Sequence, residues 1–167
     1  MNKINNRIAV AFTGPSNSGK TTLIVKLSTL LQEQGYKVAI IKHDPCDKAI
    51  FDKEGKDSFK FSQTGSEVAV VSPTRTTLFK KETSTIQDIA NMFSNFDILL
   101  VEGLKTLPLP RICIQRENID ENYFEKSDCL AIDDSINRNN LPNEMTILDL
   151  NETSQIVEWI KLNGQPI

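Results

Sequence analysis

The stretch GPSNSGKTT, residues 14–22, places glycines, a lysine and hydroxyl side chains at the spacing of a phosphate-binding loop. It fits the pattern G-x-x-x-x-G-K-[ST] at every position. In such a loop the backbone N–H groups and the N-terminus of the following helix bind an anion. The residues expected to contact a nucleotide are Gly14, Pro15, Ser16, Asn17, Ser18, Gly19, Lys20, Thr21 and Thr22. Lys20 is expected to act on the β- and γ-phosphates during catalysis, and the Thr21 hydroxyl to ligate Mg²⁺.

Two acidic residues that follow apolar strands are candidates for the metal site. Ligands of open α/β sheets lie beyond the carboxyl ends of the strands. In FDILLVEG this rule selects Glu102 as a metal ligand and assigns Asp97 to the opposite edge. In KVAIIKHD it selects Asp44, which would coordinate Mg²⁺ through water or orient a nucleophilic water as a catalytic residue. A solvent-exposed Glu102 and a turn capped by Asp44 are the simpler alternatives.

The elements that must position these residues alternate between short apolar runs and helical stretches. The expected strands are 7–13, 37–42, 68–72, 98–102, 111–115, 129–132 and 145–148. The expected helices are 20–34, 58–64, 86–93 and 152–163, the last with Asn151 as its N-cap, and the TTLFKKE stretch near Thr76 predicts an edge strand or hairpin arm. Runs such as VAII and ILLV do not alternate with polar residues, which is typical of strands covered on both faces of a mainly parallel sheet.

The fold class predicted is therefore α/β, a three-layer P-loop NTPase fold with a twisted, mainly parallel sheet and helices on both faces. At 167 residues the chain is expected to form a single nucleotide-binding domain, 1–167. Two segments without regular structure, 43–56 and 103–110, separate the elements, and long loops in a compact domain are often functional.

Composition excludes several other classes of protein. The formal net charge of −3 argues against a nucleic-acid-coating protein, which would need a basic surplus. No apolar run reaches the length of about 20 residues that a membrane helix requires. The cysteines, Cys46, Cys113 and Cys129, form no CxxC pair, so reduced thiols and a cytoplasmic location are expected.

The ordered series GPSNSGKTTLI, VAIIKHD, FDKEGKDS, VVSP, LLVEGLK and LDL resembles the molybdopterin-guanine dinucleotide biosynthesis protein B (MobB) family. The resemblance extends from about Arg7 to Trp159. It implies binding of GTP with Mg²⁺, weak hydrolysis at most, a homodimer, and an accessory role beside the guanylyltransferase that joins GMP to molybdopterin. By motif position it places Lys56 and Asp57 of GKDS, and Lys105 of VEGLK, near molybdopterin, the nucleotide or the partner enzyme.

The chain also departs from the family pattern. Pro45 and Cys46 stand where further histidines usually follow KHD, which puts a histidine-based metal role in doubt. No NKxD motif is present, so the source of guanine selectivity is open. Asp133 and Asp134, which follow the expected strand 129–132 in LAIDDS, are candidates to accept hydrogen bonds from guanine, and two solvated aspartates are the alternative.

Two other functions remain open from the sequence alone. One is an ATP-dependent small-molecule kinase or ligase similar to dethiobiotin synthetase, although the chain lacks the arginine-rich lid that phosphoryl transfer often uses. The other is a metallochaperone GTPase, for which only His43 and Cys46 offer neighbouring ligands. Whether the protein is an enzyme is likewise open, and the strand in PLPRICIQ, residues 108–115, is predicted to lie near the dimer interface.

Overall fold

The computed structural model describes residues 6–139 and 141–167 in full, together with the backbone of residue 140. The chain divides into two compact units. The first, called here the sheet unit, combines Met1–His43 with Asn95–Ile167, and the second, called the insert unit, is Asp44–Ser94. The prediction of a single domain therefore stays a prediction.

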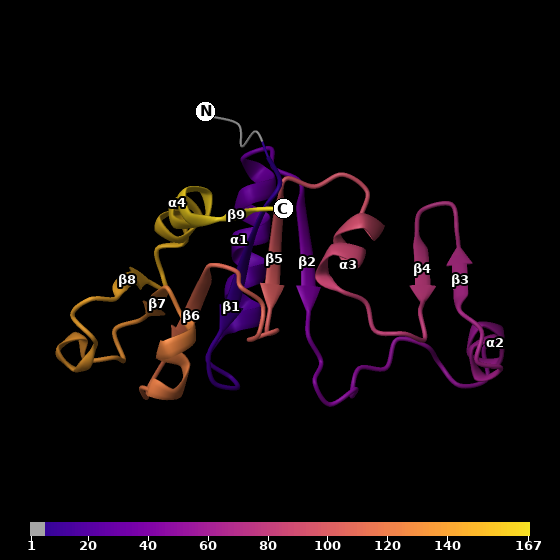
Figure 1. The fold of residues 1–167 in the computed structure, drawn as a ribbon, viewed down its shortest axis with the longest axis horizontal. Helices are drawn as coiled ribbons and strands as arrows, with labels where there is room; N and C mark the ends of the chain where they lie inside the picture. The colour runs from indigo at the N-terminus through magenta and orange to yellow at the C-terminus, as the bar shows by residue number, and fades with distance from the viewer. Residues whose placement is uncertain (1–5) are drawn as a thin grey trace. The chain divides into compact units, whose positions relative to one another are not determined.

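A mainly parallel sheet of seven strands forms the centre of the sheet unit (Figure 1). Its order is β2-β5-β1-β6-β7-β8, with β9 pairing antiparallel to β1. The strands are β1 Ile8–Thr13, β2 Val38–Lys42, β5 Ile98–Glu102, β6 Arg111–Gln115, β7 Cys129–Ile132, β8 Thr146–Asp149 and β9 Gln165–Pro166. Because β1 lies between β5 and β6, the loop after β1 emerges next to the ends of both neighbours.

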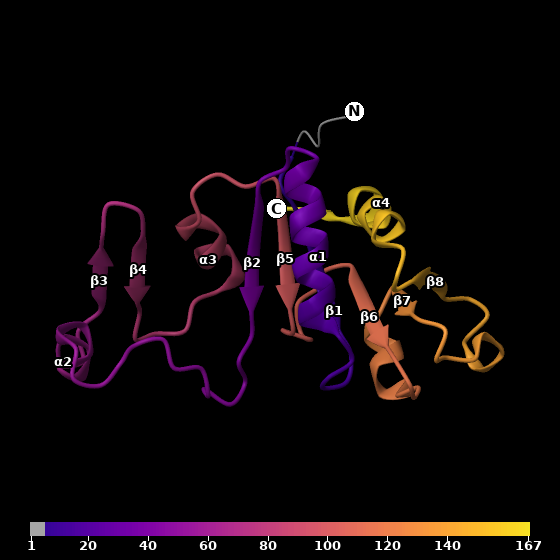
Figure 2. The same cartoon turned by 180° about the vertical axis from the view of Figure 1, so that it is seen from behind.

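Helices cover both faces of this sheet. On one face lie α1 (Lys20–Glu33) and α4 (Thr153–Asn163), which the view from behind shows (Figure 2). Their apolar side chains pack against the strands. Leu23, Leu27 and Leu31 of α1 are all buried in this core. On the other face lie the 3₁₀ helix η1 (Glu121–Lys126) and residues near η2 (Arg138–Asn140). The predicted α/β fold class is confirmed.

The insert unit holds two short helices and a β-hairpin. Its elements are α2 (Asp57–Gln63), β3 (Val68–Val71), β4 (Thr76–Phe79) and α3 (Ile86–Met92). The two strands pair antiparallel, with Val68 opposite Phe79. Thr85 begins α3 with a capping box, in which its side chain and that of Asp88 each accept the other residue's backbone N–H.

Three of the sequence predictions need correction. The run at 68–72 does form a strand, but it belongs to the hairpin and not to the parallel sheet, and its partner is the predicted hairpin arm near Thr76. The strand within PLPRICIQ is buried along its whole length between β1 and β7, so it has no free face for a dimer interface. The N-cap of α4 is Glu152 and not Asn151, because the helix begins at Thr153.

Candidate functional site

The loop between β1 and α1, residues 14–19, is named here the phosphate loop. Three of its residues have positive φ angles, namely Gly14 at 137°, Asn17 at 63° and Gly19 at 95°. A Cβ on Gly14 would lie 2.3 Å from the carbonyl oxygen of Ile114, so only glycine lets the loop pack against the end of β6. Backbone in this conformation turns its N–H groups inward and forms the concavity that binds anions.

Lys20 lies over this loop. Its ammonium group donates hydrogen bonds to the carbonyl oxygens of Gly14, at 3.1 Å, and Pro15, at 2.6 Å. Partial burial lowers the pKa of Lys20, and the negative charge of Glu102 opposes part of that shift. The two hydrogen bonds hold the ammonium group at the loop, where a bound phosphate would meet it.

Thr21 and Glu102 come together although they are far apart in the sequence. The Thr21 hydroxyl lies 3.3 and 3.4 Å from the two carboxylate oxygens of Glu102. The pairing of β1 with β5 sets Phe12 beside Glu102, which brings the carboxylate to the phosphate loop. Lys42, at the end of β2, reaches the same carboxylate at 3.5 Å.

This pair of groups fits a magnesium ion. Mg²⁺ prefers oxygen ligands and usually binds one or two protein groups together with phosphates and water. A hydroxyl and a carboxylate at hydrogen-bond distance beside a phosphate loop offer such ligands. Asp97 lies at the opposite end of β5, where its carboxylate accepts the backbone N–H of Lys37 at 2.7 Å. Glu102 and Asp97 therefore lie at opposite ends of β5, as the sequence predicts.

Asp44 begins the insert unit, and its carboxylate is occupied by its own loop. It accepts the backbone N–H groups of Ala49 and Lys48, both at 2.7 Å, and of Cys46 at 3.3 Å. These hydrogen bonds, that of Ala49 most of all, lower the pKa of Asp44. The side chain thus caps a turn, as in the simpler alternative, and its catalytic and metal roles stay predictions.

The GKDS residues also lie in the insert unit. Lys56 is the N-cap residue of α2, and Asp57 is the first residue of that helix. Asp57 forms an exposed ion pair with Lys60 at 3.3 Å. The roles of Lys56 and Asp57 in binding substrate or partner stay predictions.

Lys105 belongs to the loop 103–110, which a buried arginine holds in place. The Arg111 guanidinium donates hydrogen bonds to the carbonyl oxygens of Gly103 (3.1 Å), Leu104 (3.2 Å) and Leu107 (2.9 Å). Lys105 then projects over the ring of Tyr123, with 4.1 Å between its ammonium nitrogen and the ring centroid. Neither Arg111 nor Tyr123 belongs to a recognisable sequence motif, because both contact loop 103–110 only once the chain has folded.

The VEG glycine also has a structural reason in this region. Gly103 has a φ of 90°, and a Cβ there would lie 3.0 Å from the Cβ of His43. His43 in turn donates its backbone N–H to the carbonyl oxygen of Glu102 at 2.9 Å. The only histidine of the chain therefore packs at the end of β2 against the end of β5.

Asp133 faces an arginine. Its Oδ2 accepts the Nε–H of Arg116 at 2.7 Å, and its Oδ1 accepts both the hydroxyl and the backbone N–H of Ser135. The Ser135 hydroxyl is the largest cause of the lowered pKa of Asp133. Asp134 is exposed. The prediction that these aspartates read guanine stays a prediction.

A pocket of about 300 Å³ opens beside the phosphate loop. Residues 15–18 form one wall, and Arg116, Glu117, Asn118 and Asp120 form the other. The four residues of this second wall were not predicted as site residues from the sequence. The signal was available, because QRENID follows β6 directly and the rule that selected Glu102 applies to the end of every parallel strand.

Cys46, Cys113 and Cys129 are free thiols, and burial raises the pKa of both Cys113 and Cys129. The part of the chain that the structure describes holds no group of three or more His, Cys, Asp and Glu side chains suited to a metal ion. Within the same residues, no helix is both long and apolar enough to span a membrane.

Comparison with known proteins gives a consistent result. Residues 9–134 match the family model "Molybdopterin guanine dinucleotide synthesis protein B". The chain is 33% identical to the molybdopterin-guanine dinucleotide biosynthesis adapter protein of Haemophilus influenzae, over 95% of this chain and 90% of the relative. It is 28% identical to the protein of the same description in Escherichia coli, over 93% of this chain and 95% of the relative. In fold it resembles the crystal structure of Bacillus subtilis MobB, with a TM-score of 0.73 and 23% identity over 95% of this chain and 98% of that one.

Proposed function

Because the chain belongs to the molybdopterin guanine dinucleotide synthesis protein B family, we propose that it is a GTP-binding adapter in molybdopterin-guanine dinucleotide biosynthesis. Its partner would be the guanylyltransferase that joins GMP to molybdopterin. The observation that carries the proposal is the phosphate loop with Lys20 above it and the Thr21–Glu102 pair beside it. The two adapter proteins described above are its relatives over nearly their whole length.

Different residues of the site would bind the phosphates and the Mg²⁺ of the nucleotide complex. The inward N–H groups of the phosphate loop and the Lys20 ammonium would neutralise the phosphates. Thr21 and Glu102 would hold Mg²⁺, which bridges phosphate oxygens and screens their charge when it is bound. Lys42, 3.5 Å from Glu102, would add positive charge at the same carboxylate.

The state of Asp44 supports the proposal that turnover is slow. A general base works best with a pKa near the working pH. The pKa of Asp44 is instead lowered, and the carboxylate already accepts three backbone N–H groups. A group in this state activates water poorly, so we expect the nucleotide to be held for a partner and hydrolysed slowly.

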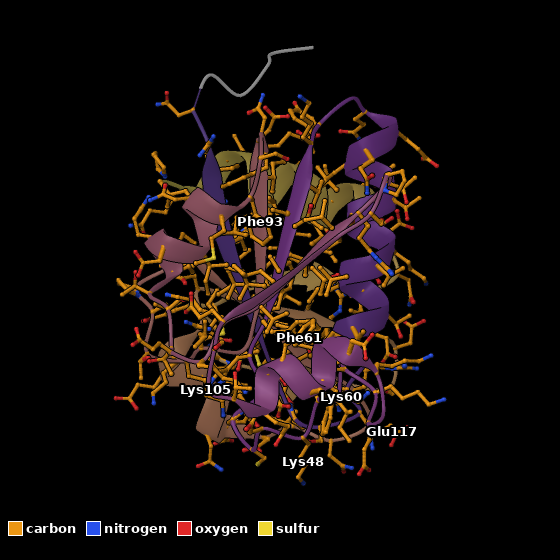
Figure 3. The ribbon with its side chains drawn as sticks, turned by 90° about the vertical axis from the view of Figure 1, so that its right-hand side faces the viewer. Lys48, Lys60, Phe61, Phe93, Lys105 and Glu117 are labelled. Carbon is orange, nitrogen blue, oxygen red and sulfur yellow. The ribbon has the colours of Figure 1, made fainter. Side chains whose placement is uncertain are left out.

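We further propose that the insert unit forms the contact to a second copy of the chain in a homodimer. Most exposed large hydrophobic side chains of the described residues belong to this unit, and they are Ile50, Phe51, Phe61, Val70, Val71, Leu78 and Met92. Ile50 and Phe51 are 89% and 84% exposed. Figure 3 shows Phe61 and Lys60 projecting from α2. Contiguous apolar patches mark interaction sites, and the proposal assigns these side chains to such a patch.

Calorimetric titration with Mg-GTP and Mg-ATP tests the nucleotide role. The wild-type chain should bind GTP more tightly than ATP, and Lys20→Ala should remove detectable binding while the circular dichroism spectrum is unchanged. Lys26→Ala is the matched control, because Lys26 is an exposed lysine on the same helix. A clear preference for ATP would favour the kinase or ligase alternative, and unchanged GTP affinity in Lys20→Ala would refute the phosphate site.

The adapter role and the dimer need separate measurements. Added protein should raise the output of the guanylyltransferase at limiting GTP, and the Lys20→Ala variant should not. The dimer is tested by sedimentation of Phe51→Ser, with Leu162→Ser on α4 as a control of comparable exposure in the sheet unit, at 83% against 84%. A monomeric wild type, or equal effects of the two substitutions, would contradict the assignment of the dimer contact to the insert unit.

A further inference from the structure

We propose that the pocket beside the phosphate loop binds the base of the nucleotide, and that the Glu117 carboxylate selects guanine there. The inference rests on the proposed GTP-binding function and adds the specificity-determining residue. The pocket lies between residues 15–18 of the phosphate loop and residues 116–120, named here the β6 loop. At about 300 Å³ it is at the small end of ligand pockets, which suits one part of a nucleotide.

Hydrogen bonds to two side chains, those of Gln115 and Ser135, hold the β6 loop in one conformation. Gln115, fully buried at the end of β6, donates its side-chain N–H to the carbonyl oxygen of Asp120 and accepts the Asp120 backbone N–H, both at 3.1 Å. The backbone N–H of Glu117 donates to the Ser135 hydroxyl at 2.7 Å. A loop ordered in advance loses little entropy when a ligand binds.

Arg116 connects the β6 loop to the phosphate loop. Its Nη1 and Cδ lie 3.8 Å from the position that a Cβ on Gly19 would occupy. Asp133 fixes the guanidinium through Nε at 2.7 Å, and both oxygens of Asp133 are occupied by Arg116 and Ser135. Asp133 is thus a positioning residue for Arg116, whose planar group is suited to stack on a base.

Glu117 supplies the one carboxylate in the pocket that has no partner among the described residues. Its φ is 63°, an uncommon conformation for a residue other than glycine, asparagine or aspartate, and such strain often accompanies function. A carboxylate only accepts hydrogen bonds. Guanine presents N–H donors at N1 and N2, whereas adenine presents an acceptor at N1, so a carboxylate at the base edge favours guanine.

The other polar groups of the β6 loop discriminate less well. The Asp120 carboxylate already accepts the backbone and side-chain N–H groups of Asn122, at 3.1 and 2.8 Å. The Asn118 amide carries both a donor and an acceptor, so it can pair with either purine. Glu117 is therefore the residue to which the structure assigns the selection.

Ser18 gives independent evidence of a ligand. Ser18 is only 5% exposed and lines the pocket. Its side-chain hydroxyl has no hydrogen-bond partner within the residues that the structure describes. Buried hydroxyl groups in folded proteins are nearly always paired. An oxygen of a bound nucleotide would satisfy this hydroxyl at the wall nearest to the phosphates.

The test is calorimetric titration of the full chain with Mg-GTP, Mg-ATP and magnesium tripolyphosphate. Wild type should prefer GTP over ATP, and Glu117→Gln should reduce that preference by about 10- to 100-fold, the range for hydrogen bonds to a charged group. Affinity for tripolyphosphate should not change. Glu121→Gln, an exposed glutamate four residues away that does not line the pocket, should behave as wild type. Glu117→Gly should show the same loss of preference with equal or greater stability, because it also relieves the positive φ.

The outcomes separate this inference from the proposed function. An unchanged ratio of GTP to ATP affinity in Glu117→Gln would overturn the assignment of Glu117. Tripolyphosphate binding as tight as GTP binding in wild type would overturn the base pocket and leave the phosphate site standing. Failure of wild type to bind any of the three ligands would refute the proposed function itself, and with it the pocket.

Discussion

Replacing Arg111 by methionine should destabilise the chain by removing the group that holds loop 103–110. Arg111 is the first residue of β6 and is only 2% exposed. Its guanidinium makes three hydrogen bonds to loop carbonyl oxygens, at 2.9, 3.1 and 3.2 Å. Methionine keeps much of the apolar stem but supplies none of these donors.

The size of the effect follows from those contacts. A hydrogen bond with one charged partner contributes about 1.5–3 kcal/mol. The gain is reduced because burial of the guanidinium is unfavourable, which is also why the pKa of Arg111 is lowered. The half-buried carbonyl groups of Gly103 and Leu104 can recover part of the loss by binding water. We therefore expect the free energy of unfolding to fall by about 2–3 kcal/mol.

The assay is urea denaturation followed by fluorescence of Trp159, the only tryptophan, which packs against the core from α4. Hydrogen exchange at Leu107 gives a local readout, because its N–H donates to the carbonyl oxygen of Leu104 within the held loop. The exchange rate should rise in Arg111→Met. Arg75→Met, at an exposed arginine of the insert unit, is the matched control and should change stability by about 0.5 kcal/mol or less.

A loss below about 0.5 kcal/mol in Arg111→Met would show that the three guanidinium hydrogen bonds do not stabilise the fold. So would an equal loss in the control variant, since the effect would then not depend on the buried guanidinium. Unchanged protection at Leu107 with lowered global stability would show that Arg111 stabilises the sheet and does not hold the loop.

Three further predictions follow from the same site. Gly14→Ala should lower the free energy of unfolding by about 1–3 kcal/mol in urea titrations and weaken GTP binding, because its Cβ would meet the Ile114 carbonyl at 2.3 Å. Asp133→Asn should lower stability by a constant amount between pH 5 and 8, and the difference should vanish in more acidic urea titrations. Because the pKa of Asp133 is lowered in the folded chain, its ionised carboxylate adds to the free energy of unfolding. This contribution is fully present above the ordinary carboxyl pKa of about 3.9 and is lost as the pH falls through the lowered value. GTP binding should take up protons at alkaline pH, seen as buffer-dependent calorimetric heats, because phosphates would raise the lowered pKa of Lys20.

The sheet strands were predictable because their signals are local. Apolar runs bounded by glycine, proline and charged residues placed β5, β6 and β7 at their observed limits, and β1 and β2 within one residue. The helix α1 was predicted from leucines at helical spacing and from the glycine at position 35. The position of the phosphate loop could likewise be predicted, because its backbone conformation depends on the spacing of its glycines.

Which strands pair with one another could not be predicted from the sequence in the same way. The run VAVV, residues 68–71, looks like a buried parallel strand, yet it forms half of a hairpin with an exposed Val71. A short apolar run fits either setting, and only the competition among all strands for neighbours decides it. The same limit explains the wrong placement of β6 at an interface, because its position at the centre of the sheet depends on strand order.

From the sequence alone one could predict the phosphate-binding motif, the family of the chain, and the edge of the sheet at which Lys20, Thr21 and Glu102 meet. Each of these depends on local spacing or on the common direction of parallel strands. Only the tertiary structure decided what surrounds that site. The Arg111 hydrogen bonds, the stacking of Lys105 on Tyr123 and the pairing of Arg116 with Asp133 join residues from different elements. Such contacts carry no periodic or motif signal, because they depend on how the chain packs and not on the order of its residues.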